Sequence, residues 1–117
     1  MCGGGSGVME AASKGAAGAG GTVVGILPGA DRHAANPFVT VAIATGLGEL
    51  RNGLIVRAVD AVIAVGGAFG TLSEVALALK TGVPVVGIGT WELDGVERYD
   101  DVEAAVARAL AVASAGR

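Results

Sequence analysis

The 117-residue chain is long enough for one domain with a hydrophobic core: 52% of its residues are hydrophobic and 3% are aromatic. Its formal net charge of −3 leaves no basic patch for nucleic acid, and the single cysteine, Cys2, excludes an internal disulfide. No apolar run reaches membrane-spanning length and no signal-peptide pattern opens the chain, so we expect a cytoplasmic protein without a membrane or nucleic-acid partner.

The chain opens on a glycine turn at residues 3–7, followed by a predicted helix over residues 8–19. A turn of this kind normally follows a strand, and Cys2-Gly-Gly-Gly is typical of the end of one. We therefore expect that the chain begins downstream of its natural start.

The rest of the chain alternates between predicted strands and helices. A loop with a small hairpin at Asp94-Gly95 is expected over residues 91–99, and Asp100-Asp101 should cap the last helix. The alternation predicts one α/β domain over residues 1–117, with a parallel sheet between two helical layers. The expected strands are 22–27, 39–44, 61–65 and 83–89, and the expected helices after the first are 50–59, one that starts at 71, and one that starts after Asp101.

Apolar residues at helical spacing identify the faces that should be buried. In the helix that starts at residue 71 these are Leu72, Val75, Ala76 and Leu79, and in the helix over 50–59 they are Leu54, Ile55, Ala58 and Val59. In the last helix they are Val102, Ala105, Val106, Ala109, Leu110 and Ala113.

A second glycine turn, with Gly66, Gly67 and Gly70, joins the buried strand over 61–65 to the next helix. Ligands bind at the carboxyl ends of parallel strands, and a helix start offers free N–H groups to an anion. Two such turns on one sheet suit a small molecule that carries a phosphate. The alternative is that the glycines only permit tight turns. Neither the dinucleotide nor the P-loop fingerprint occurs, which disfavours hydride transfer and nucleoside triphosphate hydrolysis.

Three polar candidates accompany these turns. Thr71 and Glu74 have the spacing of a capping box, which would place Thr71 at the N-cap and the Glu74 carboxylate in the first helical turn, towards the crevice. Arg51 begins a helix where it could clamp a phosphate or a leaving group, or simply lie in solvent. His33 stands alone in a polar loop, so we expect no metal site.

Two motifs resemble those of a known family. The stretch G-G-A-F-G-T-L-S-E at residues 66–74 resembles the P-G-G-x-G-T-x-x-E motif of the LOG family of cytokinin-activating phosphoribohydrolases. The stretch G-G-G-S-G-V-M at residues 3–9 resembles that family's G-G-G-x-x-G-L-M. The stretches A-N-P-F at 35–38, T-G-L-G at 45–48 and R-N at 51–52 are similar to a bacterial side branch near molybdenum-cofactor carrier proteins.

The resemblance implies a Rossmann-like fold that here lacks the family's first β-α unit, a homodimer or higher homo-oligomer, and no cofactor. The implied ligand is a nucleoside monophosphate or a molybdopterin-like molecule. Arg51 and Glu74 would catalyse hydrolysis of the bond between base and ribose 5-phosphate. The implied ligand-binding residues are Gly4, Gly5, Gly7, Asn52, Gly66, Gly67, Gly70 and Thr71.

Two departures from the LOG motifs favour a different function. Asn52 stands where the enzymes have lysine, and Val65 stands where they have proline. The alternative is a non-catalytic carrier or sensor that holds a phosphorylated pterin or nucleotide derivative. A truncated fragment without function is a third alternative.

Overall fold

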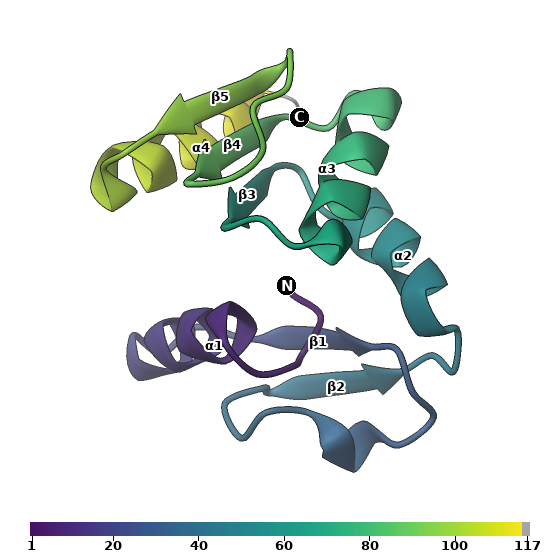
Figure 1. Cartoon of the computed structure of the whole chain (residues 1–117). Helices are drawn as coiled ribbons and strands as arrows, with labels where there is room; N and C mark the ends of the chain where they lie inside the picture. The colour runs from purple at the N-terminus through teal and green to yellow at the C-terminus, as the bar shows by residue number, and fades with distance from the viewer. Residues whose placement is uncertain (116–117) are drawn as a thin grey trace. The chain divides into compact units, whose positions relative to one another are not determined.

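The computed structural model describes residues 1–115 and has parallel strands flanked by helices, which confirms the predicted α/β class (Figure 1). It divides into a first unit, Met1–Ile55, and a second unit that starts at Val56, and each is described by itself. Within residues 1–115, no helix combines the length and the apolar composition that a membrane span requires.

The elements of the first unit are α1 (Val8–Gly18), β1 (Val24–Leu27), η1 (Arg32–Ala34), β2 (Val41–Ala44) and η2 (Gly48–Leu50). Helix α2 (Arg51–Ala58) crosses the boundary, and β3 (Val62–Val65), α3 (Phe69–Thr81), β4 (Val85–Ile88), β5 (Val96–Tyr99) and α4 (Val102–Ala115) follow it.

In the first unit, β1 pairs in parallel with β2, in the register that places Val24 opposite Val41. On its other edge, β1 forms an isolated parallel bridge through Gly25 to Cys2. The Cys2 N–H donates to the carbonyl of Val24 at 3.0 Å, and the Ile26 N–H donates to the carbonyl of Cys2 at 2.9 Å. Strand-type pairing at Cys2 is what the sequence predicted, and it places the first glycine turn directly after a paired residue.

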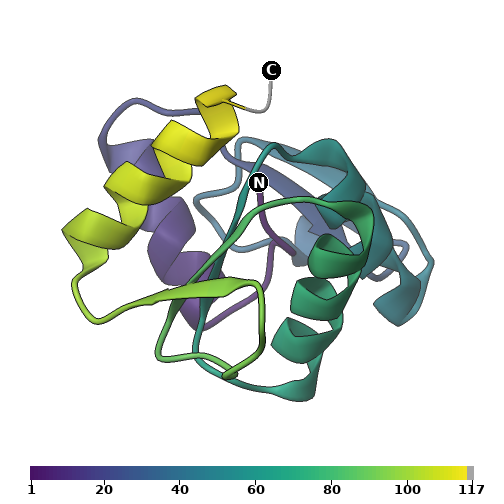
Figure 2. The same ribbon diagram turned by 90° about the horizontal axis from the view of Figure 1, so that it is seen from above.

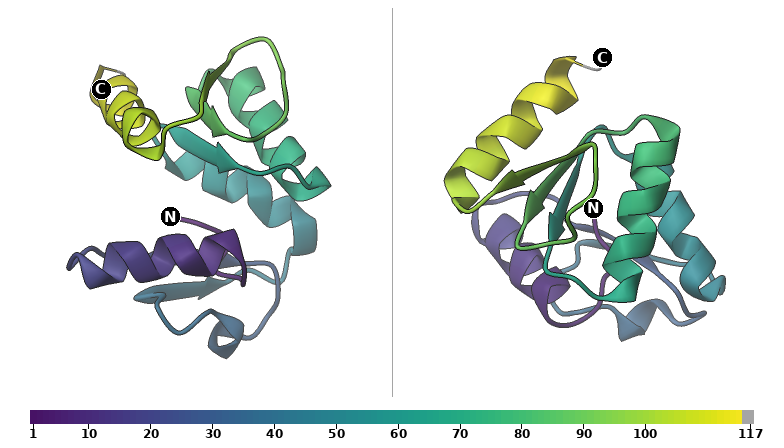
Figure 3. Two further views of the ribbon diagram at one scale, coloured as in Figure 1. Left: turned by 60° about the vertical axis from the view of Figure 1, so that its left-hand side comes forward. Right: turned by 45° about the horizontal axis from the view of Figure 1, so that its top comes forward.

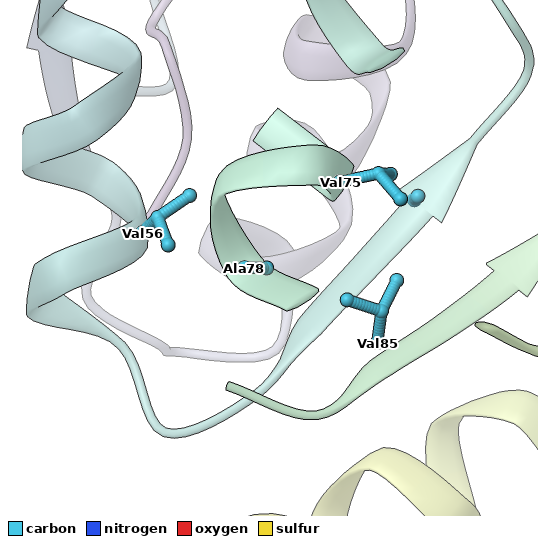
Figure 4. Close-up of a cluster of buried hydrophobic side chains, with 5 residues drawn as sticks. Val56, Val75, Ala78 and Val85 are labelled. Carbon is cyan, nitrogen blue, oxygen red and sulfur yellow. The ribbon is translucent and has the colours of Figure 1, made fainter. Parts of the chain in front are cut away.

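In the second unit, a parallel sheet in the order β3-β4-β5 lies between α3 on one face and α4 on the other (Figures 2 and 3). Consecutive strand residues point to opposite faces, and β4 shows this directly. Val85 packs in a cluster with Val75 and Ala78 of α3, whereas Val86 packs with Ala105 and Ala109 of α4. Figure 4 shows the first cluster, to which Val56 of α2 also contributes. Strand β4 is therefore buried on both sides, as an unbroken apolar run predicts. The same prediction is wrong for β3, where only Ala64 is buried and Ile63 and Val65 are exposed.

Residues 91–99 depart from the prediction. A turn does occur at Asp94-Gly95, where Gly95 has a φ of 97°, but the expected hairpin is wrong. The residues that follow the turn form β5, which pairs in parallel with β4, so that Val96 lies opposite Val85. The sequence of β5 is V-E-R-Y, and Glu97 and Arg98 are exposed. An edge strand of this kind lacks the apolar run by which the other strands were recognised.

The predicted helical faces are right in part. In α3, Val75 and Ala78 are buried while Ala76 is exposed, so the buried face is turned from the one expected. In α2, Ile55 and Val56 are buried whereas Leu54 is exposed. The last helix has its predicted cap, because the Asp101 carboxylate accepts from the Glu103 and Ala104 N–H groups at 3.3 Å each. Its buried residues are Ala105 and Ala109, whereas Val102, Val106 and Leu110 of the predicted face are exposed.

Candidate functional site

In the first glycine turn, side chains of neighbouring residues lie close to the glycine backbone. Gly4 and Gly7 have φ values of 73° and 69°, a region that side chains other than glycine rarely enter. A Cβ added at Gly4 would lie 2.7 Å from Cδ2 of Leu27, and one added at Gly5 would lie 2.8 Å from the terminal methyl of Met9. Gly7 is the N-cap of α1 and provides no side-chain acceptor. The first N–H groups of this helix therefore keep their capacity to bind an anion.

Arg51 lies against this turn. A Cβ added at Gly3 would be 2.6 Å from Nη2 of Arg51, so the absence of a side chain at Gly3 is what lets the guanidinium approach the backbone. Nη1 of Arg51 donates to Oδ1 of Asn52, which is itself buried. The buried side chain of Asn52 thus orients the guanidinium of Arg51 through this hydrogen bond. The structure therefore brings Arg51 together with the glycine turn at residues 3–7.

A buried polar network holds the turn from behind. The Asn36 side-chain amide donates to the carbonyl of Gly5 at 2.9 Å and to Oγ of Ser13 at 3.3 Å. The backbone N–H of Asn36 donates to the carbonyl of Gly4 at 2.8 Å, and Oδ1 of Asn36 accepts from the Phe38 N–H at 3.1 Å. Asn36 and Ser13 are both buried. Asn36 therefore joins the loop before β2 to two consecutive carbonyls of the glycine turn.

The second glycine turn follows β3 and opens α3. Gly66 has a φ of 73°, and Gly67, Ala68 and Gly70 are exposed. The predicted capping box is wrong: α3 begins at Phe69, its N-cap is Ala68, and no side chain caps it. Thr71 is thus the third residue of the helix. Because Ala68 already has the extended backbone of an N-cap, with φ −92° and ψ 170°, the helix starts three residues earlier than it would with Thr71 as its N-cap.

The first turn of α3 contains no acidic residue, whereas Glu10 occupies the first turn of α1. Glu74 is the sixth residue of α3 and is half-buried, so it lies beyond the first turn where the capping box would have placed it. The uncapped N–H groups of α3, with the positive end of the helix dipole, therefore face no carboxylate from their own turn.

Two aromatic rings stand beside the second turn. Phe69 and Trp91 are stacked, with ring centroids 6.2 Å apart and an angle of 23° between the ring planes. Nε1–H of Trp91 donates to the carbonyl of Ala68 at 3.3 Å, and a Cβ added at Gly67 would lie 3.5 Å from Nε1. The indole therefore packs directly on the turn, and Phe69 stacks against the indole.

Comparisons with known proteins bear on this arrangement. The family model LDcluster4, described as the SLOG cluster4 family, matches residues 1–115. The chain belongs to the SLOG cluster4 family. An uncharacterized protein of Archaeoglobus fulgidus is 45% identical over 105 residues, which are 89% of this chain and 69% of that relative.

Two solved structures of other proteins are also similar. The molybdenum cofactor binding protein of the phototrophic bacterium Rippkaea orientalis is 39% identical with a TM-score of 0.83, covering 90% of this chain and 71% of that one. The molybdenum cofactor carrier protein of Chlamydomonas reinhardtii is 39% identical with a TM-score of 0.84, covering 96% and 76%. These findings confirm the Rossmann-like fold and the predicted branch of the LOG family near molybdenum-cofactor carriers.

Other features of this SLOG protein lie outside the two turns. An apolar groove of about 280 Å³ opens between the start of β3 and α4, lined by Asp60, Ala61, Ile63, Val106, Ala109, Leu110 and Ala113. Residues 60 and 61 precede β3, whereas the second glycine turn follows its carboxyl end, so the groove is not part of the candidate site. No group of three or more potential metal ligands occurs among residues 1–115.

The shifted pKa values also belong to surface pairs. Hydrogen bonds from the backbone N–H and the side chain of His33 lower the pKa of Asp31, and both side chains are exposed. The hydrogen bonds from Arg108 lower the pKa of Glu97, and the same pair raises the pKa of Arg108. This pair joins β5 to α4.

Sequence reasoning missed three residues of these surroundings: Asn36, Phe69 and Trp91. Asn36 precedes proline and its side chain accepts from Phe38 two residues on, a local turn that the A-N-P-F stretch could have indicated. Phe69 stands inside the glycine motif itself. Trp91, by contrast, lies 23 residues after the carbonyl that it binds, and no local pattern indicates that contact.

Proposed function

We propose that this protein binds a phosphorylated small molecule and serves as a carrier of molybdenum cofactor rather than as a hydrolase. The observation that carries the proposal is the 39% identity, at TM-scores of 0.83 and 0.84, to a molybdenum cofactor binding protein and a molybdenum cofactor carrier. The two uncapped helix starts after glycine turns support it, because each can accept a phosphate.

The proposed phosphate ligands are the backbone N–H groups around Gly4, Gly5 and Gly7 and around Gly66, Gly67, Gly70 and Thr71. Arg51 supplies the cation at the first turn, and Asn52 keeps its guanidinium in place through the bond to Nη1. A buried asparagine in that position suits a binding role, since an amide can orient an arginine but neither carries charge nor moves a proton at neutral pH.

A second candidate function is the hydrolysis of nucleoside 5′-monophosphates. It is favoured by the G-T-x-x-E segment that ends at Glu74 and by the presence of Arg51 at the first turn. In that reaction the Glu74 carboxylate would activate water or stabilise the oxocarbenium-like ribose, and the arginine would steady the phosphate or the leaving base.

One experiment separates the two functions. The protein is incubated with molybdenum cofactor or with AMP and passed over a desalting column, and the retained pterin or nucleotide and any free adenine are quantified by chromatography. A carrier retains intact ligand and releases no adenine. Release of adenine that is abolished in the Glu74→Ala variant would support the hydrolase instead.

A pair of arginine variants tests whether the ligand binds at the first glycine turn. Arg51→Ala should weaken retention about tenfold or more, the value of one charge-assisted hydrogen bond. Arg57→Ala removes an equal charge from an exposed position of the same helix and should leave retention unchanged. Equal retention by the two variants would refute the placement at the first turn. The homodimer or higher homo-oligomer that the family resemblance implies is tested separately, by sedimentation equilibrium of the unmodified chain.

A further inference from the structure

An aromatic side chain is held in solvent beside the second glycine turn. Phe69, the first residue of α3, is 81% exposed and has the largest exposed fraction of the large hydrophobic residues in the described part of the chain. Burying a ring of this size is strongly favourable, so the exposed phenylalanine keeps apolar area that a ligand could cover.

The ring is also held in place. It stacks on Trp91, which in turn donates a hydrogen bond to the carbonyl of Ala68 and packs against Gly67. Trp91 is the chain's only tryptophan, and it is one of the four aromatic residues in the whole sequence. Two of these four rings are thus concentrated on one turn. A pair ordered in this way loses little conformational freedom when a further flat ring stacks on it.

The same turn carries the features of an anion site. Ala68 is the N-cap of α3 and offers no side-chain acceptor, the first turn of the helix has no acidic residue, and the positive φ of Gly66 bends the backbone into the helix. Phe69 belongs to this first turn. A ligand whose phosphate binds the first N–H groups would therefore have its remaining atoms within reach of the aromatic pair.

We propose that Phe69 and Trp91 form a stacking platform for the flat heteroaromatic ring of a phosphorylated ligand, a pterin or a purine, whose phosphate binds at the start of α3. This inference rests on the proposed function and adds a ring subsite to it. Aromatic stacking tolerates any ring with a π face. The pair therefore favours ligands with a flat aromatic ring, and other groups of the protein must distinguish a pterin from a purine.

The test uses the tryptophan as a probe. AMP and molybdenum cofactor are titrated into the full chain while indole fluorescence is recorded, and affinities are measured by calorimetry, with inorganic phosphate as a ligand that has no ring. Binding of either ring ligand should quench Trp91. Phe69→Ala should weaken that ligand about tenfold or more and leave inorganic phosphate unchanged, whereas Phe69→Tyr should retain the affinity.

Two controls keep the result specific. Leu110→Ala truncates a side chain of the same unit that is 65% exposed, and it should change none of these affinities. Because Phe69 is exposed, Phe69→Ala should keep the thermal unfolding midpoint of the unmodified protein.

Four outcomes would overturn the inference. Unchanged ligand affinity in Phe69→Ala, or an equal loss for inorganic phosphate, would remove the ring subsite and leave the proposed function intact. Dissociation of an oligomer in Phe69→Ala without a change in ligand affinity would show that a second copy covers the ring. If the unmodified chain binds neither AMP nor molybdenum cofactor, the proposed function itself fails.

Discussion

Replacing Asn36 by alanine tests how the first glycine turn is held. The substitution removes the amide that donates to the carbonyl of Gly5 at 2.9 Å and the oxygen that accepts from the Phe38 N–H at 3.1 Å. Ser13 stays satisfied, because its hydroxyl donates to the carbonyl of Met9 at 2.7 Å. The variant therefore leaves two backbone groups without their partners.

The magnitude follows from that count. An intramolecular hydrogen bond contributes about 1 kcal/mol net, and a buried group left unsatisfied costs about 1–3 kcal/mol. Gly5 and Phe38 are half-buried, so water can reach them in part. We expect Asn36→Ala to lower the free energy of unfolding by about 2–3 kcal/mol, measured by urea denaturation with circular dichroism. His33→Ala changes an exposed residue of the same loop and should cost no more than about 0.5 kcal/mol.

Asn36→Asp refines the test, because it keeps the acceptor for Phe38 but sets a carboxylate against the carbonyl of Gly5. At neutral pH it should be at least as destabilising as Asn36→Ala. The loss of stability in Asn36→Asp should become smaller below about pH 4, because the protonated carboxyl can then donate a hydrogen bond to the carbonyl of Gly5. Both variants should also bind ligand more weakly than the unmodified chain. A loss of stability below about 0.5 kcal/mol for Asn36→Ala, with unchanged affinity, would refute the view that Asn36 holds the turn.

Three further predictions concern the second unit. Val75→Ala removes two methyl groups from a fully buried site and should lower the free energy of unfolding by about 2–3 kcal/mol in the same assay, whereas Val102→Ala, at an exposed site, should change it little. Glu97→Gln should lower the thermal unfolding midpoint at neutral pH only. Because Arg108 depresses the pKa of Glu97, the stability it provides is lost as pH falls, and variant and parent should converge below about pH 4. Ala68→Asp should cap α3, raise the stability by about 1 kcal/mol and weaken phosphate binding measured by calorimetry.

The sequence predicted those parts of the fold that depend on local pattern. Unbroken apolar runs identified β3 and β4, and the glycine clusters marked the turns after Cys2 and after β3. Strand β5 was not predicted, because its sequence lacks an apolar run and it is a strand only through its pairing with β4. Val96–Tyr99 pairs with β4 on one edge and has polar side chains at its exposed positions.

The candidate site was predictable to the same extent. The sequence placed Arg51 at a strand-to-helix junction, but its approach to Gly3 is seen only in the structure. The hydrogen bond from Asn36 to Gly5 spans 31 residues, and the stacking of Phe69 on Trp91 depends on a loop that returns to the turn. Contacts of this range arise from how the strands pair, which single-sequence patterns do not specify.

The failed capping box is informative about function. Helix α4, which follows no glycine turn, is capped by Asp101, and η1 is capped by Asp31. Helices α1 and α3, which both follow glycine turns, have Gly7 and Ala68 at the N-cap and no side-chain cap. A cap is worth about 1 kcal/mol, and it occupies the N–H groups that a phosphate would otherwise bind. Helices α1 and α3 lack this stabilisation, and their first N–H groups stay available for the phosphate that we propose they bind.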